Sequence, residues 1–294
     1  MKNNMKSLKE YILEAREKRI AIGHFNISNI EGFWAVVMAS RELDVPVIIG
    51  VSEGERDFIG VNEVVALVNT YREHSGQPVF LNADHTYSFE RVKEAVDVGF
   101  DSVIYDGTEL NFEQNVIATK KSIEYAKQKN PNIIFEAEIG FIGKSSKILD
   151  SIPDEVKISD EFLTTSIHAS DFVKSTGIDM LAPAVGNIHG MLKGGKDPAL
   201  NIKRIKEIYE AIKIPLVLHG ASGNSDNDVL GAIDVGVAVV HVNTELRVAY
   251  RTGLMKSIQE NPDEIAPYKY LKGARMAMQK VVSEKLKVFN KLSQ

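Results

Sequence analysis

Short apolar runs recur along the chain, and amphipathic segments with helical spacing lie between them. The runs occupy residues 20–26, 46–52, 78–85, 102–107, 132–140, 179–187, 215–223 and 237–243. Residues 88–99 and 111–128 are examples of the helical segments, with apolar positions three and four residues apart. Continuous apolar strands that alternate with helices predict a parallel sheet buried on both faces.

Eight such units in 294 residues favour one α/β domain spanning 1–294, a (β/α)8 TIM barrel with extra C-terminal helices. An open doubly wound sheet is the alternative, but no G-x-G-x-x-G motif follows the first run. Residues 140–160 form a long polar segment after the fifth run, which is typical of a lid or substrate loop. The tail from about residue 264 predicts helix beyond the barrel, serving as an oligomer contact or a surface cover.

Composition narrows the functional classes. The chain is 44% hydrophobic and 26% charged, which supplies a large core and argues against disorder. A net charge of −5 without a basic stripe argues against a nucleic-acid partner. The N-terminal segment lacks the apolar core of a signal peptide, and no stretch approaches membrane-spanning length, so we expect a cytoplasmic protein without a membrane partner. Because there is no cysteine, a metal site would have to use histidines and carboxylates.

In a barrel, polar residues at the ends of the strands line one mouth, where the chemistry occurs. These positions are Asn26, Ser52, Asp84, His85, Asp106, Glu136, Glu138, Asn187, His189, His219, His241 and Asn243. A single histidine at a strand end is more often structural than metal-binding. The coincidence of His85, His189 and His219, from three different strands, reverses that expectation and predicts a three-histidine zinc site with one open position.

The remaining histidines receive no function. His74 ends a charged helix, His168 begins a polar one, and the direction of His24 cannot be predicted. The glycines in "HGMLKGG" (189–195) and "HGASG" (219–223) would let backbone N–H groups approach an anion. Together with nearby Ser222, Thr244 and Lys193, they indicate a phosphorylated substrate. No apolar run contains a lysine, which argues against Schiff-base chemistry.

These motifs carry a family resemblance. The combination of "DH" (84–85), "GNIHG" (186–190) and "HGASG" (219–223), within a match that runs nearly end to end, resembles the class II, metal-dependent ketose-bisphosphate aldolases. That family includes fructose- and tagatose-bisphosphate enzymes. The resemblance implies a lyase of carbohydrate metabolism (glycolysis), cytoplasmic and assembled as a homodimer or homotetramer.

The resemblance also implies roles for individual residues. One Zn²⁺ per subunit would be held by His85, His189 and His219, with Glu138 near an alternative metal position and room for a second or a monovalent cation. Three imidazoles suit zinc, although cobalt or iron would also fit. Asp84 would be the acid/base that exchanges a proton with the C4 hydroxyl. The residues expected at the substrate and its phosphates are Asn26, Ser52, Gly190, Lys193, Gly220, Ser222, His241, Asn243, Thr244 and Arg247. Arg247 would meet the distal phosphate, in its own or a neighbouring subunit, unless it is a solvated helix arginine.

Two stretches depart from the family pattern. Where many members carry a Gly-Gly-Glu motif with a proton-shuttling Glu, this chain reads "GKSSK", with Ser145 and Ser146 in place of carboxylates. Asp150 or Glu155 are candidates to supply the missing group. Where the family reads Lys-x-Asn, this chain has Val239 and His241. We expect His241 to face the enediolate or its phosphate rather than to bind the metal.

The leading function is therefore reversible cleavage of a ketose 1,6-bisphosphate, with fructose 1,6-bisphosphate first, into dihydroxyacetone phosphate and glyceraldehyde 3-phosphate. A tagatose-bisphosphate or other phosphorylated-ketose aldolase is the close alternative. From other classes come a zinc- and sugar-phosphate-binding barrel with little turnover, and a metal-dependent isomerase or epimerase.

Overall fold

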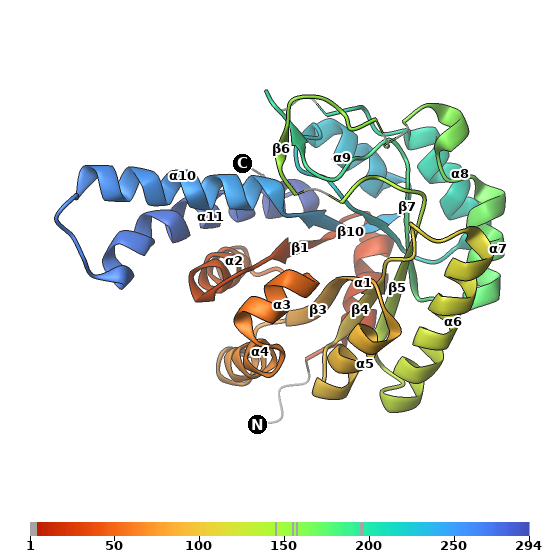
Figure 1. Cartoon of the computed structure of the whole chain (residues 1–294), viewed down its shortest axis with the longest axis horizontal. Helices are drawn as coiled ribbons and strands as arrows, with labels where there is room; N and C mark the ends of the chain where they lie inside the picture. The colour runs from red at the N-terminus through yellow and green to blue at the C-terminus, as the bar shows by residue number, and fades with distance from the viewer. Residues whose placement is uncertain (1–4, 145, 155, 157, 195–196, 294) are drawn as a thin grey trace.

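Eight parallel strands close into a barrel in the order β1-β10-β9-β7-β5-β4-β3-β2, which confirms the predicted TIM barrel (Figure 1). The computed structural model describes residues 5–144, 146–154, 156, 158–194 and 197–293. The barrel strands are β1 (Ile22–Asn26), β2 (Val47–Val51), β3 (Val79–Thr86), β4 (Ser102–Tyr105), β5 (Ile134–Ile139), β7 (Met180–Pro183), β9 (Leu216–Leu218) and β10 (Val237–Val242). Each strand overlaps one predicted apolar run, because both faces of a barrel strand are buried.

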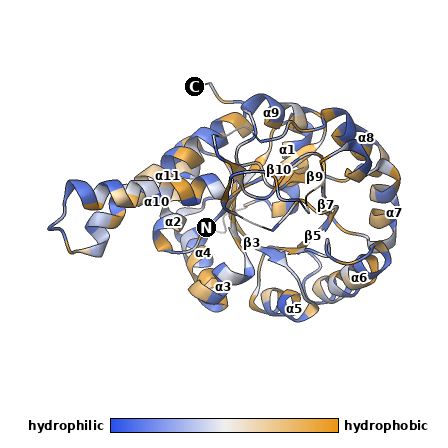
Figure 2. Ribbon diagram, turned by 45° about the horizontal axis from the view of Figure 1, so that its top comes forward, coloured by the Kyte–Doolittle hydropathy of each residue, from blue (hydrophilic) through white to orange (hydrophobic). Residues whose placement is uncertain are grey.

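Helices surround the strands as an outer ring (Figure 2). They are α2 (Ile30–Leu43), α3 (Glu53–Ile59), α4 (Val61–Ser75), α5 (Phe89–Val98), α6 (Phe112–Lys129), α7 (Ser166–Thr176), α8 (Ile202–Ile212) and α9 (Asp226–Asp234), and they are followed in the chain by α10 (Thr244–Glu260) and α11 (Pro267–Phe289). Local chemistry sets the ends of the predicted helices. The Ser88 side chain caps α5, and Gly99, at φ 98°, ends it in the left-handed region. Among the described helices, none is long and apolar enough to cross a membrane.

The inside of the barrel changes from apolar to polar along the strands. At the N-terminal end, side chains such as Ile22, Phe80 and Val239 form an inner apolar cluster together with α1 (Leu8–Lys18), which closes that end. Alternate residues of a strand share a face. In β3, Phe80 is therefore followed on the inner face by Asn82 and then Asp84, both buried. The polar layers meet at the C-terminal end, where chemistry occurs in this fold.

The two long loops at that end are joined by a small sheet that the sequence did not predict. Within the segment 140–160, residues Ile148–Leu149 form β6, and they pair in parallel with β8 (Met191–Leu192) from the loop after β7. A short 3-10 helix, Asp160–Phe162, follows. The predicted lid or substrate loop is therefore tied into a ribbon built from two loops.

The predicted C-terminal helix is confirmed, and it forms an arm with α10. The two helices run side by side away from the barrel (Figures 1 and 2). They approach closely at Gly253 and Gly273, where a Cβ on Gly253 would lie 2.6 Å from the Gly273 carbonyl oxygen. The second half of α11 returns to the barrel and buries Val282, Leu286 and Phe289 in the main core.

Candidate active site

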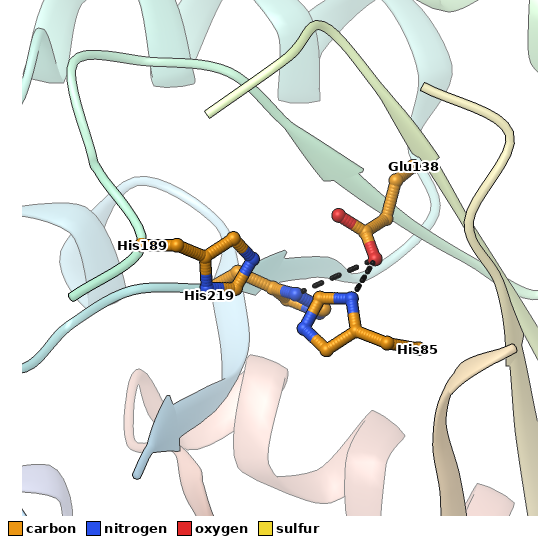
Figure 3. A group of neighbouring side chains, drawn as sticks. All are labelled: His85, Glu138, His189 and His219. Atoms are coloured by element: carbon orange, nitrogen blue, oxygen red, sulfur yellow. Dashed lines mark ion pairs between the residues drawn. The ribbon is translucent and has the colours of Figure 1, made fainter. Parts of the chain in front are cut away.

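Three histidines and one carboxylate converge at the mouth of the barrel (Figure 3). His85 lies near the end of β3 and Glu138 near the end of β5, while His189 and His219 follow β7 and β9. One side-chain atom from each lies within 4.8 Å of the others. The structure thus brings together the three histidines that the sequence singled out, with Glu138 beside them.

This group has the donors that a divalent cation needs. His189 Nε2 is buried without a hydrogen-bond partner among the described residues, and the buried Glu138 Oε1 lies 3.0 Å from His85 Nδ1 and 3.6 Å from His219 Nδ1 (Figure 3). A buried polar atom without a partner is costly, and metal coordination is one way to satisfy it. Three imidazole nitrogens and a carboxylate oxygen suit zinc. The residues present therefore fit the implied metal.

A second layer of carboxylates orients the imidazoles. Glu136 Oε1 lies 2.7 Å from His219 Nε2, and Asp106 Oδ2 lies 3.2 Å from His85 Nδ1. A carboxylate on one ring nitrogen fixes the tautomer and leaves the other nitrogen free for a metal. The sequence placed both carboxylates at the mouth but gave them no role, because it could not show which histidine each one meets.

His85 is held in an unusual backbone conformation. Its φ is +39°, a region that a side chain with a Cβ rarely adopts, and the pairing of β3 with β4 shifts register around it. Such strain persists where the surrounding structure enforces it, and it concentrates at functional sites. The backbone kink turns consecutive residues, Asp84 and His85, toward the same mouth.

The electrostatics of the group favour a bound cation. Burial disfavours the charged form of His85, but Asp84 and Glu138 outweigh it and raise its pKa well above the usual value. The pKa of His219 is raised against burial in the same way, by Glu138 and Glu136. Burial and the two neighbouring histidines lower the pKa of His189 well below its usual value. The buried carboxylates thus stabilise a positive charge in this site, and a bound metal ion would provide that charge.

Asp84 belongs to a hydrogen-bonded chain that reaches the protein surface. The Asn26 side-chain amide donates to Asp84 Oδ2 and to Glu55 Oε2, both at 2.8 Å. Glu55 in turn accepts from Arg247 at 2.7 Å and from the backbone N–H and hydroxyl of Ser52, both at 2.9 Å. Arg247 is therefore paired within its own chain, and Ser52 is turned toward Glu55. Glu55 had no signal in the sequence beyond its helix-capping position.

A small cavity lies between the histidines and the glycine loops. It measures about 20 Å³ and is lined by Asn26, Asp84, His85, Ser146, His189, Gly190, Gly220, Ser222, His241, Asn243 and Thr244. Ser146 reaches it from the lid, 3.4 Å from the Asn243 amide. A second cavity of about 230 Å³ shares Asn26 and Asn243 with the first and includes Arg247. Ligands of drug size occupy roughly 300 Å³ or more, so neither cavity alone reaches that volume in this conformation.

Other predicted positions lie apart from this cavity. Lys193 is mostly exposed on the ribbon, 3.7 Å from the exposed Asp150 carboxylate, and lines neither cavity. Asp150 therefore does not reach the mouth in this conformation. Ser145 and Glu155 lie outside the described residues.

His241 lies in a column of stacked imidazoles. Its ring is 3.5 Å from that of His24 with 3° between the planes, and 4.0 Å from that of His219 with 21° between the planes. Its Nδ1 lies 3.6 Å from Asp84 Oδ1. Burial lowers the pKa of His24 to about 4, and burial and the two neighbouring rings lower that of His241 well below its usual value. Burial thus favours the neutral form of both rings.

Comparison with known proteins gives a consistent picture. A family model described as fructose-bisphosphate aldolase class II matches residues 6–294. Fructose-bisphosphate aldolases of Staphylococcus aureus and Staphylococcus epidermidis are 38% and 37% identical over 286 residues, with 96% of each chain covered. The crystal structure of the YdjI aldolase from Escherichia coli K12 superposes with a TM-score of 0.81 at 30% identity, covering 96% of both chains.

Proposed function

The chain belongs to the class II fructose-bisphosphate aldolase family, and from this premise we propose that it reversibly cleaves fructose 1,6-bisphosphate into dihydroxyacetone phosphate and glyceraldehyde 3-phosphate. The observation that carries the proposal is the convergence of His85, His189, His219 and Glu138 beside a buried aspartate. The enzyme is a lyase, and fructose 1,6-bisphosphate is the substrate that its relatives' names support.

We assign one Zn²⁺ per chain to His85, His189 and His219, with Glu138 as an alternative ligand. Zinc would polarise the ketose carbonyl and stabilise the negative charge that develops when the C3–C4 bond breaks. The protein holds the imidazoles in place through Glu136 and Asp106.

Asp84 is the proton acceptor for the C4 hydroxyl. Its Oδ2 is held by Asn26, whereas its Oδ1 is buried without a hydrogen-bond partner in the described part of the chain. Burial opposes the charged form, but His85 and His241 outweigh it and lower the Asp84 pKa well below the usual value. A carboxylate with one anchored oxygen and one free oxygen is arranged to take a proton during cleavage and return it during condensation.

The first cavity supplies groups for the phosphate of the dihydroxyacetone phosphate half. Gly190 and Gly220 have φ values of +104° and +62°, and a Cβ on Gly220 would lie 2.1 Å from the Ile188 carbonyl oxygen. Asn243 and Thr244 stand at the N-terminus of the 17-residue helix α10, where free N–H groups and the helix dipole favour an anion. The aldehyde half would extend into the second cavity, toward Arg247, which would have to exchange Glu55 for phosphate.

We also propose that the enzyme is a cytoplasmic homodimer or homotetramer that uses its helical arm for assembly. Ile258, Ile265, Tyr268 and Met276 are exposed on the arm, with Ile265 at 88% and Tyr268 at 77%. Large apolar side chains gathered on a projecting element are typical of an interface. Sedimentation of the wild type against an Ile265→Lys variant would test this, because the charged variant should dissociate.

The activity is tested by triose-phosphate release from fructose 1,6-bisphosphate, with tagatose 1,6-bisphosphate, its C4 epimer, as the competing substrate. Cleavage should disappear when zinc is removed and return when it is restored, and His85→Ala should lose both zinc and activity. Cleavage that survives complete zinc removal would contradict the metal assignment. A larger kcat/KM for the epimer would contradict the substrate assignment.

A further inference from the structure

We propose that His24 is a positioning residue that holds the His241 imidazole between His219 and Asp84 in the geometry needed for aldol cleavage. The inference rests on the proposed function. His24 lies in β1 and His241 in β10, and the parallel register pairs the two residues side by side. Their rings face each other at 3.5 Å with nearly parallel planes.

The strand next to β1 leaves room for this second imidazole. His24 occupies the space over Gly50 in β2, where an added Cβ would lie 2.1 Å from His24 Cε1 and 2.6 Å from its Nε2. Gly50 has no positive φ, so its backbone does not require glycine. Glycine is required at this position by the close approach of the His24 ring.

A hydrogen-bonded relay fixes the orientation of His24. Its Nε2 lies 3.1 Å from Asn82 Oδ1, and the Asn82 amide nitrogen donates to the Ser102 hydroxyl at 2.7 Å. With the Asn82 amide nitrogen directed at Ser102, its oxygen faces His24, and His24 Nε2 is the donor in this arrangement. His24 is thus held at its edge by Asn82 and on one face by Gly50, which leaves the other face for His241.

The cluster of His24, Asp84 and His241 also brings possible ligand atoms within 4.8 Å of one another, but its geometry disfavours a second metal site. A metal binds an imidazole nitrogen in the plane of the ring, at about 2.0–2.1 Å for zinc. Two stacked rings whose centroids are 3.5 Å apart and whose planes are inclined by only 3° cannot both hold one ion in plane at such a distance. The two rings are placed to stack on each other rather than to coordinate one metal ion together.

His241 is the point through which His24 would act. It stacks on His219, places Nδ1 3.6 Å from the free Asp84 oxygen, and lines the cavity that would receive the substrate. If the ring turned, this nitrogen would leave Asp84 and the cavity wall would change shape. Misplacement of a positioning group by about 1 Å can cost roughly 100-fold in rate.

Two variants separate stacking from the other contacts of His24. His24→Phe and His24→Leu both lose the hydrogen bond to Asn82, but only Phe keeps a flat ring against His241. We expect kcat within about threefold of wild type for His24→Phe and about 10- to 100-fold lower for His24→Leu, with KM and zinc content changed little. Equal kcat values for the two variants would overturn the proposal.

A double-mutant cycle tests the route of action. If His24 acts through His241, then His24→Leu should add nothing to the defect of His241→Ala, whereas independent structural effects would multiply. Kinetic defects that multiply in the double mutant would refute the positioning role.

Gly50→Ala should reduce kcat by displacing His24, while Gly54→Ala, whose added Cβ meets nothing within 4 Å, serves as its control. A Gly50→Ala enzyme with wild-type kcat would also refute the positioning role.

Crystal structures of the two His24 variants give a readout that does not depend on turnover. The His241 and His219 rings should stay stacked in His24→Phe, and the His241 ring should turn in His24→Leu. An unmoved ring in His24→Leu would overturn the inference. Failure of the wild type to release triose phosphate from any bisphosphate would instead refute the proposed function, and the ring geometry would still decide the role of His24.

Discussion

Replacement of Glu136 by Gln should weaken zinc binding without weakening the fold. Glu136 and His219 are each only 1% exposed, and their contacting atoms are 2.7 Å apart. Gln keeps the volume and an acceptor oxygen, but it lacks the negative charge of Glu136. That charge holds the proton on His219 Nε2, so that His219 Nδ1 stays unprotonated and available to the metal. Its amide can also present N–H to the ring, which favours the wrong tautomer.

The size of the effect follows from this geometry. Loss of a carboxylate that orients a metal-binding histidine typically costs about 10- to 100-fold in metal affinity, or about 1.4–2.7 kcal/mol. Stability should respond in the opposite direction. Burial raises the pKa of Glu136, and its Oε2 has no hydrogen-bond partner within the described structure, so the buried charge is costly to the metal-free fold. The metal-free Gln variant should be at least as stable as the wild type.

The assay is competition with a chromophoric zinc chelator, together with urea unfolding of both metal-free proteins. Glu113→Gln, an exposed position in the first turn of α6, is the matched control and should change neither property. Wild-type zinc affinity in Glu136→Gln would refute the orienting role. A large loss of metal-free stability would show that Glu136 holds the barrel together rather than the metal ligand.

Three further predictions concern other parts of the structure. Burial lowers the pKa of His24 from 6.5 to about 4, so the unfolded chain binds a proton that the native state refuses, and stability falls as the pH drops from 6.5 toward 4. In urea unfolding at pH 5, the wild type should lose about 2 kcal/mol relative to His24→Phe, and a pH-independent difference would contradict this. Asp84→Asn should lower kcat about 10²- to 10⁴-fold while zinc analysis still finds one ion per chain; substantial turnover would exclude Asp84 as the proton acceptor. Leu286→Ala, in the fully buried part of α11, should reduce the free energy of unfolding by about 2–5 kcal/mol, and a smaller loss would mean that α11 is not part of the barrel core.

The barrel could be predicted from the sequence because both faces of its strands are buried, so each strand is a short apolar run between helices. The same property hid the direction of individual side chains. His24 shares the inner face of β1 with Ile22 and Asn26, but Gly23 and Phe25 on the other face are buried as well. The sequence of β1 therefore shows no alternation of polar and apolar residues that would tell which side chains point into the barrel. The two-residue strands β6 and β8 are too short to show any period.

The site was predictable where residue type limited the chemistry. Histidines at three strand ends had to meet at one mouth, and they do. Contacts between distant residues left no such signal. Arg247 and Glu55 are 192 positions apart, and only the folded chain pairs them, so an arginine expected at a phosphate is already bound to a carboxylate. The role of Ser146 at the cavity likewise depends on where the ribbon holds the lid.

The ribbon of β6 and β8 links the proposed metal site to the loop at 140–160. The His189 backbone N–H donates to the Ile142 carbonyl, and those of Met191 and Lys193 donate to the carbonyls of Lys147 and Leu149, so the proposed zinc ligand His189 and the loop at 140–160 share one set of hydrogen bonds. Thermodynamic reciprocity then applies: if zinc strengthens sugar-phosphate binding by ordering the lid, a bound sugar phosphate must strengthen zinc binding by the same factor. An aldolase working at saturating substrate would retain its metal under chelating conditions that strip the resting enzyme.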